Sequence, residues 1–270
     1  MVIEHFFIHY QMPAQYVYWG ENYLDLYRLA NAEKAFRKIA SIDNISAATA
    51  TAGQFREIAE KLLKVDTGVI LNSGQFIFNI FEFEKIPWQE SVRNDLVEWR
   101  LKKVFPENIE DYVHHYFKLG KNRILSILLK KSLKEKIEQL FAESGVSLVH
   151  MGNSTVEIMN HVARLKKDAP DFFIEIDNNL AITVFQDRTV PFYIRKFRSA
   201  QAADIVNEVV KTINFVKNSY ARTPRTFSLL IRRFPGDSQP IRDELARGEI
   251  LPVELKRDEQ FIFPIKRVKK

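Results

Sequence analysis

The chain of 270 residues contains no cysteine and only nine glycines. Without cysteine it has no disulfide bond, no thiolate nucleophile and no cysteine-ligated zinc or iron–sulfur cluster, and this composition suits a reducing cytoplasm. Backbone that closely approaches a phosphate group usually needs glycine. The shortage of glycine therefore argues against a nucleotide hydrolase.

Long apolar runs are also absent. No stretch approaches the roughly 20 apolar residues that cross a bilayer, because polar residues interrupt even the most apolar segment, Val69–Phe83. The N-terminal sequence MVIEHFFIHYQMP has no basic start and no small-residue cleavage site, so we expect no signal peptide. Hydrophobic residues make up 46% and charged residues 27% of the chain, which is typical of a soluble folded protein.

Basic residues exceed acidic ones only slightly, 40 against 34, for a net charge of +6. They concentrate in the stretch 121–136 and in the C-terminal residues 256–270. Neither cluster carries a nucleic-acid recognition motif, so we interpret both as solvated surface and expect no nucleic-acid partner. A weaker alternative is that the stretch 121–136 contacts anionic lipid headgroups.

The first part of the chain alternates strands and helices. The pattern predicts a hairpin at 16–29 with its turn at 20–22, strands at 68–71, 76–83, 111–118, 123–130 and 146–151, and helices at 46–64, 88–103, 132–144 and 154–167. Ser132 and Glu135 have the spacing of a capping box, and Gly145 stands where a helix usually ends. The apolar face predicted for the helix 88–103 consists of Val92, Leu96, Trp99 and Val104.

Pro170 is the predicted boundary between two lobes. After it we expect strands at 172–176, 180–185 and 190–197, a long helix at 200–220 and a further strand at 226–231. Three consecutive strands followed by a helix and another strand indicate an α/β fold with mixed rather than purely parallel sheets.

Four segments match one known family in order and character. They are Lys85-Ile86-Pro87-Trp88 with the helix after it, the strand–turn–strand at 111–130 with a helix ending at Ser144-Gly145-Val146, the three strands at 172–197 that end near Arg195 and Arg198, and the helix at 204–220. Over about residues 16–231 the chain thus resembles the PilM family of type IV pilus assembly, in the actin-like superfamily, and the related cytoplasmic domain of the type II secretion L protein.

The resemblance implies an actin-like (ribonuclease H-like) α/β fold with two lobes. Residues 1–170 would form the first lobe, with an inserted subdomain at about 86–150, and residues 171–270 the second. In the family, a small subdomain between the arginine-rich strand and the long helix forms one wall of the nucleotide cleft. Here Lys196–Ala200 passes directly from strand to helix, so we expect this cleft-wall subdomain to be missing.

The first phosphate turn departs from the family pattern. Actin-like ATPases carry Asp-x-Gly there, where the aspartate holds the metal-bound water and the glycine admits the phosphates. In this chain Gly20 is kept, but Tyr18 stands in the place of the aspartate. The basic residue expected in the next strand is replaced by Asp25.

The second and third turns depart further. The second phosphate turn reads Glu175-Ile176-Asp177-Asn178-Asn179, so that Asp177 places a carboxylate where the family has glycine and would repel phosphate. The nearest threonine is Thr183. On the adenosine side, Leu229-Leu230-Ile231 runs into two arginines without the family's glycine pair.

The sequence therefore predicts a protein without catalytic residues, bound cofactor or metal, whose degenerate phosphate-turn positions are Tyr18, Gly20, Glu175, Asp177 and Asn178. Two alternatives stay open. In the first, Glu175 and Asp177 bind Mg²⁺ directly. In the second, the chain is an active actin-like ATPase or kinase with atypical phosphate contacts.

Other candidate residues have simpler interpretations. His114 and His115 are neighbours in a predicted strand and face opposite sides, so they cannot chelate one metal ion together. His5 and His9 lack a third ligand, and Ser73 lies in a turn without a nearby base. The aromatic residues of the hairpin 16–29 are predicted to be mostly core, with a partner-binding surface as the alternative.

The expected function is that of a cytoplasmic scaffold, peripheral to the inner membrane. By the resemblance, it would bind the cytoplasmic N-terminal segment of a single-span inner-membrane protein in a groove around residues 86–150. The candidate contact residues are Tyr112, Tyr116, Lys121 and Arg123. An assembly ATPase is a further expected partner, and contact with the membrane surface is a weaker expectation.

Overall fold

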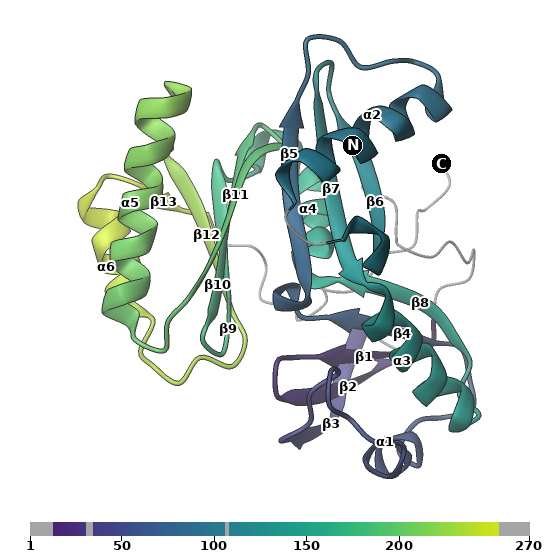
Figure 1. Ribbon diagram of the computed structural model, residues 1–270. Coiled ribbons are helices and arrows are strands. Elements are labelled where there is room, and N and C mark those ends of the chain that lie inside the picture. The colour runs from purple at the N-terminus through teal and green to yellow at the C-terminus, as the bar shows by residue number, and fades with distance from the viewer. Residues whose placement is uncertain (1–12, 31–34, 106–107, 254–270) are drawn as a thin grey trace. The chain divides into compact units, whose positions relative to one another are not determined.

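The computed structural model describes residues 13–30, 35–105 and 108–253 (Figure 1). These residues form two compact units, the first comprising residues 13–158 and the second residues 159–253. The division falls within helix α4 (Ser154–Leu165), whereas the sequence analysis places a lobe boundary at Pro170, just beyond the 3-10 turn Lys166–Asp168 that follows α4. Each unit is described below by itself.

The first unit contains a five-stranded mixed sheet in the order β3-β2-β1-β4-β8. Its strands are β1 (Gln15–Trp19), β2 (Tyr23–Ala30), β3 (Ala35–Asp43), β4 (Thr67–Leu71) and β8 (Leu148–Asn153). The β1–β2 and β2–β3 pairs are antiparallel, whereas β1, β4 and β8 run parallel. The carboxyl ends of three parallel strands therefore lie at one edge of this sheet.

Helices α1 (Ala52–Ala59) and α3 (Lys131–Glu143) are joined to this sheet by aromatic packing. Phe55 of α1 stacks on Trp19 of β1, with 5.8 Å between ring centroids, and lies 4.8 Å from Phe141 of α3. All three rings are fully buried. The stack anchors α3 on the core of the first sheet.

The predicted helix 46–64 is wrong in its bounds. Thr51 caps α1 through a capping box with Gln54, so the helix starts at residue 52 and spans only eight residues. Strand β3 was not predicted at all. It pairs with β2 from Tyr23 opposite Asp43 to Ala30 opposite Ala35, and its Phe36 is buried.

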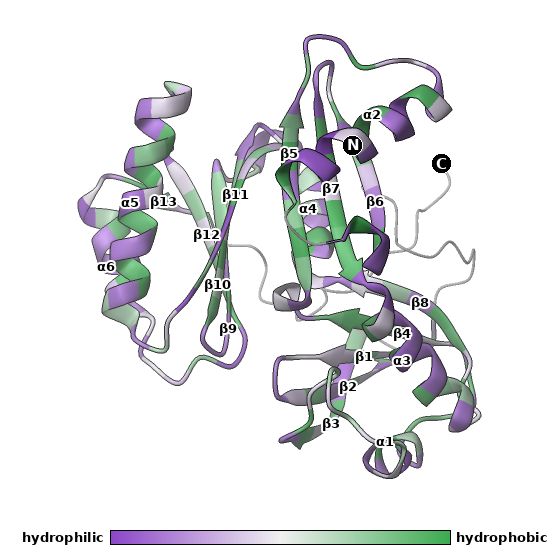
Figure 2. Ribbon diagram, in the orientation of Figure 1, coloured by the Kyte–Doolittle hydropathy of each residue, from purple (hydrophilic) through white to green (hydrophobic). Residues whose placement is uncertain are grey.

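The first unit also contains a three-stranded antiparallel sheet in the order β5-β7-β6, of which β6 and β7 fall in the segment 86–150 predicted as an inserted subdomain, whereas β5 precedes it. Its strands are β5 (Phe76–Glu82), β6 (Tyr112–Leu119) and β7 (Arg123–Lys130), and helix α2 (Glu90–Val104) covers one face. Strands β5 and β7 are strongly hydrophobic (Figure 2). The 3-10 turn Ser73–Gln75 precedes β5, and the 3-10 turn Ile109–Asp111 precedes β6. Only the first of these turns separates β4 from β5, yet the two strands belong to different sheets.

The apolar face predicted for α2 is wrong. Val97 and Leu101 are fully buried against the three-stranded sheet, whereas Val92, Trp99 and Val104 are 44%, 50% and 48% exposed. Helix α2 carries apolar residues on two opposite sides, so periodicity alone cannot tell which side is buried.

The start of α3 also differs from the prediction, while its end is confirmed. The helix begins at Lys131 after Lys130, without a side-chain cap, so Ser132 and Glu135 do not form the predicted capping box. Gly145 follows the helix with a φ of +69°, the left-handed conformation that glycine adopts without strain.

The second unit is a mixed sheet with two helices. Its strands are β9 (Phe172–Asp177), β10 (Leu180–Asp187), β11 (Val190–Arg198), β12 (Thr226–Ile231) and β13 (Leu251–Pro252), in the order β11-β10-β9-β12-β13, and its helices are α5 (Ala202–Tyr220) and α6 (Gln239–Arg247). The two helices pack on the apolar core that the sheet shares with them. Strand β11 leads to α5 within three residues, Ser199–Gln201, so no subdomain lies between them. The mixed α/β class is confirmed.

Helices that could cross a bilayer are missing from the described part of the chain, because none combines sufficient length with sufficient apolar character.

The two sides of α2 give the first prediction. Leu101→Ala removes a fully buried side chain and is expected to lower the free energy of unfolding by about 2–5 kcal/mol. Val92→Ala, on the exposed side of the same helix, is expected to change it by less than about 0.5 kcal/mol. Urea denaturation followed by circular dichroism measures both, and equal losses would contradict the assignment of the buried side.

Candidate functional site

The turn after β1 keeps its glycine, but an aromatic ring fills the space beside it. The backbone N–H of Gly20 donates to the carbonyl oxygen of Tyr23 at 2.9 Å, which closes the hairpin. A Cβ atom on Gly20 would lie 2.2 Å from Cε1 of Tyr23, and Tyr23 is only 1% exposed. Here the glycine makes room for the Tyr23 ring.

Tyr18, at the family's aspartate position, is also buried at 1% exposure. It belongs to a cluster of Tyr16, Tyr18, Tyr23, Tyr27, Phe36 and Ile70. The ring centroids of Tyr18 and Tyr23 are 5.9 Å apart. A phenol is neutral at pH 7 and lacks the charge with which a carboxylate holds a metal ion or its water. The prediction that the hairpin aromatics are mostly core is confirmed.

Asp25, which replaces the family's basic residue, is engaged within its own sheet. It lies in β2 opposite Tyr18 and is 5% exposed. Ser41 Oγ in β3 donates a hydrogen bond to its Oδ1, and Lys38 Nζ lies 3.6 Å from its Oδ2. The carboxylate therefore links β2 to β3, the strand that the sequence analysis missed.

Polar side chains at the carboxyl ends of β4 and β8 bind one another. Ser73 Oγ lies 3.1 Å from Asn153 Oδ1 and 2.9 Å from Ser154 Oγ, and it accepts hydrogen bonds from the backbone N–H and the hydroxyl of Thr155, at 3.0 and 2.7 Å. These four residues are at most 1% exposed. Ser73 is thus a buried turn residue, as predicted, but its long-range partners were not predicted.

The residues that the sequence analysis aligns with the second phosphate turn lie in the second unit, at the end of β9. Glu175 is 3% exposed, and its Oε1 lies 3.5 Å from Nε of Arg232, which follows β12. The backbone N–H of Arg232 donates to the carbonyl oxygen of Ile176 at 2.9 Å. An arginine from the turn after β12 thus forms an ion pair with the glutamate at the end of β9, a pairing that the separate motifs do not reveal.

Asp177 and Asn178 shape the turn itself. Asp177 is 1% exposed at the end of β9, and Asn178 has a φ of +53°, a left-handed conformation that asparagine tolerates better than most residues. The side chain of Asn179, the residue that follows, accepts a hydrogen bond from Arg198 at 3.1 Å.

Within residues 13–30, 35–105 and 108–253, no three His, Asp or Glu side chains are grouped so as to hold a metal ion. His114 and His115 lie side by side in β6 on opposite faces of its sheet, as the pairing of each with β7 implies. His5 and His9 lie outside the described residues.

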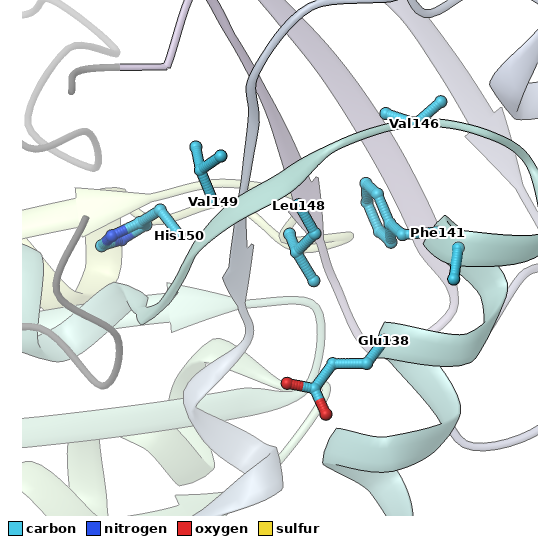
Figure 3. Close-up of a pocket in the computed structure, with 7 residues that line it drawn as sticks. Glu138, Phe141, Val146, Leu148, Val149 and His150 are labelled. Atoms are coloured by element: carbon cyan, nitrogen blue, oxygen red, sulfur yellow. The ribbon is translucent and has the colours of Figure 1, made fainter. Parts of the chain in front are cut away.

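An open pocket lies between α3 and β8 (Figure 3). Its volume is about 340 Å³, and its lining consists of Glu138, Phe141, Ala142, Val146, Leu148, Val149 and His150. Most of these side chains are apolar, and the Glu138 carboxylate lies at its α3 side (Figure 3). Lys134 Nζ lies 2.8 Å from both oxygens of this carboxylate. The pocket falls within the region 86–150 that was predicted to bind a partner.

The predicted contact residues divide into two groups. Tyr112 is buried beneath α2 with its ring edge-on to Phe105, and Tyr116 is half-buried there, where its hydroxyl contacts Arg93 and Asn94. Lys121 is exposed in the β6–β7 turn, and Arg123 forms an ion pair with Glu82 at 3.1 Å. The two tyrosines and the two basic residues therefore do not form one surface.

The basic stretch 121–136 is not a single patch either. Arg123 and Lys134 are in ion pairs, and Lys136 Nζ donates to the carbonyl oxygen of Ala48 at 2.7 Å. These groups come from the start of β7 and from α3.

Comparison with known proteins identifies the fold. No family model and no curated protein matches the chain in sequence. A PilM–PilN type IV pilus biogenesis complex matches in structure with a TM-score of 0.70 and 15% identity, over 89% of this chain and 88% of the other. A Bacteroides thetaiotaomicron protein with an actin-like ATPase fold and unknown function gives 0.60 and 8%, over 90% and 91%.

A third similar structure is the cytoplasmic domain of EpsL, an inner-membrane component of the type II secretion system of Vibrio cholerae. Its TM-score is 0.56 at 11% identity, over 86% of this chain and 94% of the other. The actin-like fold, shortened between β11 and α5, and the structural resemblance to PilM and to the secretion L protein are therefore confirmed.

The contact between Gly20 and Tyr23 can be tested by a double-mutant cycle. Gly20→Ala forces a methyl group into the Tyr23 ring and is expected to cost about 1–3 kcal/mol of unfolding free energy. In a Tyr23→Leu background the ring is gone, so the same substitution is expected to cost less by at least about 0.5 kcal/mol. Urea denaturation of the four proteins measures the coupling.

Gly53→Ala is the matched control for this cycle. Gly53 lies within α1, and the nearest atom to its added Cβ would be Thr51 Oγ1 at 3.9 Å. Alanine there is expected to stabilise the protein by about 0.5–1 kcal/mol, through helix propensity. If the losses of unfolding free energy for Gly20→Ala and Tyr23→Leu were additive, the direct contact between Gly20 and the Tyr23 ring would be contradicted.

His114 gives a pH-dependent prediction. Burial lowers the pKa of His114 below its usual range, with a smaller opposing effect of Glu98. The unfolded chain therefore binds more protons below about pH 6.5, so stability falls as the pH drops from that value through the folded-state pKa. His114→Gln is expected to reduce this decline between pH 7 and pH 5 in urea denaturation, and an unchanged pH profile would exclude the effect.

Proposed function

We propose that the protein is a non-catalytic actin-like scaffold of a type IV pilus or type II secretion-like assembly. In this proposal it binds the cytoplasmic N-terminal segment of a single-span inner-membrane protein. One contrast carries the proposal. Side chains of the protein fill or pair with the positions that bind phosphate in actin-like ATPases, whereas an apolar pocket between α3 and β8 is open.

Two of the similar structures come from assemblies of this kind. One is a complex of PilM with PilN from type IV pilus biogenesis, and the other is the cytoplasmic domain of an inner-membrane secretion component. At 15% and 11% identity they establish the fold alone. They support the proposal because the fold is known in both settings.

The pocket has the chemistry of a peptide anchor site. Phe141, Leu148 and Val149 offer apolar contact, and Glu138 supplies a negative charge next to it. A partner peptide would place an apolar side chain in the pocket and a basic group near Glu138, in exchange for or beside Lys134. Lys121 and Arg123 would contact an acidic part of the partner, whereas Tyr112 and Tyr116 would act by supporting α2.

We further propose a cytoplasmic location at the surface of the inner membrane, because a partner with a single membrane span keeps its bound scaffold there. An assembly ATPase would be a second partner. The peripheral membrane contact is a separate part of this proposal and needs a surface of its own.

Filling the pocket tests the peptide proposal. The ligand is a synthetic peptide with the sequence of the cytoplasmic segment of a single-span protein encoded beside this gene. Ala142→Trp places a large ring in the pocket from an exposed helix position, and is expected to weaken peptide binding about tenfold or more, which is about 1.4 kcal/mol. Isothermal titration calorimetry measures the affinity.

Ala246→Trp is the control, since Ala246 is an exposed residue of α6 in the second unit. It is expected to leave peptide affinity unchanged. Equal affinity of both variants, or no binding of any such peptide to the unmodified protein, would refute the pocket as the partner site.

Titration with Mg-ATP tests the proposal that the protein is non-catalytic. The chain is expected to give no binding heat at millimolar nucleotide, because Tyr18 lacks the metal-holding charge and Glu175 is paired with Arg232. A micromolar site, or nucleotide hydrolysis above background, would instead favour the active ATPase or kinase.

A further inference from the structure

We infer that the outward side of α2 is a docking surface for an anionic lipid membrane. This inference rests on the proposed peripheral membrane contact and assigns it to a surface different from the stretch 121–136. The surface, called the tryptophan face below, consists of Trp88, Val92, Leu96, Trp99, Arg100 and Lys103. All six lie on α2 or just before it, within the first unit.

Exposure of large apolar side chains is the first observation. Trp88 is 85% exposed, Trp99 50% and Val92 44%, and Leu96 is half-buried between them. The third tryptophan, Trp19, is fully buried. Scattered exposed apolar residues are ordinary, but Val92 and Trp99 lie on one side of α2 and Trp88 is exposed just before its start, so that large apolar side chains concentrate at this helix and mark an interaction surface.

The charges around this patch are the second observation. At 100° per residue, Val92, Leu96, Trp99, Arg100 and Lys103 fall within one arc of about 100° around the helix. No acidic residue lies within that arc. The acids of α2 are Glu90, Asp95 and Glu98; of these, Asp95 borders the arc next to Trp99 and Glu98 is paired with Lys102 at 2.8 Å. The tryptophan face is therefore apolar and basic, which complements an anionic surface.

In the described part of the chain, neither basic side chain forms an ion pair that would compete with lipid. Lys103 Nζ lies 3.9 Å from the centre of the Trp99 ring, so its charge sits directly over the aromatic surface. Arg100 is half-buried, and its Nε is a buried atom without a hydrogen-bond partner among the described residues. Lys103 can reach headgroup phosphates while its aliphatic stem stays on the apolar patch, and Arg100 adds a second positive charge beside it.

A bilayer fits this face better than a protein partner does. Tryptophan with flanking lysine or arginine is typical of the membrane–water interface, where the ring lies at headgroup level. Tryptophan and arginine are also common in protein–protein interfaces, but lysine is depleted from them, so Lys103 directly over the Trp99 ring favours a bilayer. Trp88 stands almost fully in solvent, so it projects from the surface as an inserting side chain would.

Vesicle sedimentation tests the inference with the full chain. Vesicles of equal parts phosphatidylglycerol and phosphatidylcholine are expected to bind the protein at low salt and release it as salt rises, while pure phosphatidylcholine binds it weakly. Binding should shift the emission of Trp88 and Trp99 to shorter wavelength, against a constant contribution from buried Trp19. No binding at low salt, or equal binding to both vesicles, would overturn the inference.

Two pairs of variants identify the surface. Trp88→Ala with Trp99→Ala is expected to abolish the emission shift and most binding, and Arg100→Gln with Lys103→Gln to weaken binding about fivefold for each charge removed. Lys64→Gln with Lys217→Gln removes the same charge from exposed positions elsewhere and should have little effect. Melting temperatures show whether each variant is folded. Equal weakening by both charge pairs would overturn the assignment to α2.

The same proteins are titrated with the partner peptide. Loss of vesicle binding with peptide binding retained is expected for the tryptophan-face variants, because they leave the pocket intact. Failure of the unmodified protein to bind vesicles, with peptide bound, would refute this inference alone. Self-association that the tryptophan substitutions abolish, without vesicle binding, would show that the face binds a second copy and would also overturn it.

Discussion

Tyrosine rings packed on glycine backbone determine what the first sheet can bind. A Cβ on Gly68 in β4 would lie 2.2 Å from Tyr16, as close as one on Gly20 would lie to Tyr23. Tyr16 and Gly68 are direct neighbours in the β1–β4 ladder. Burial of each ring contributes roughly 1.5–3 kcal/mol to the stability of the fold. The rings can pack there only because the glycines have no side chain. Glycine that admits phosphate in a nucleotide site here admits the protein's own side chains.

Polar side chains at the other strand ends are paired within the protein. In open α/β sheets, ligands bind beyond the carboxyl ends of the strands. At the ends of β4 and β8 the hydroxyls around Ser73 satisfy one another, and in the second unit Glu175 is paired with Arg232. Polar groups that are already paired gain little from a phosphate, because binding would first break these contacts. Aromatic packing, hydroxyl bonding and ion pairing thus each fill or pair these positions with the protein's own side chains.

The sequence predicted the fold well where local signals were strong, and poorly where tertiary contacts decide. The hairpin at β1–β2, the strands β9 to β12 of the second unit and the Gly145 helix end follow from turn residues and alternation, whereas the short strand β13 was not predicted. Strand β3 mixes polar and apolar residues on both faces, and only its pairing with β2 fixes it. The buried side of α2 was missed because both sides are apolar. The pairing of Glu175 with Arg232 joins residues far apart in sequence, so no motif predicts it.

The pocket and the tryptophan face rest on different supports within the first unit. Helix α3 is tied to the five-stranded sheet through the stack of Phe141, Phe55 and Trp19, whereas α2 lies on the three-stranded sheet through Val97 and Leu101. A scaffold of the kind proposed holds its binding surfaces ready-made. Rigid elements with buried anchors provide this, because little conformational entropy is then lost on binding. Two surfaces on separate sheets allow a membrane partner and the bilayer to be bound at once without competing for the same side chains.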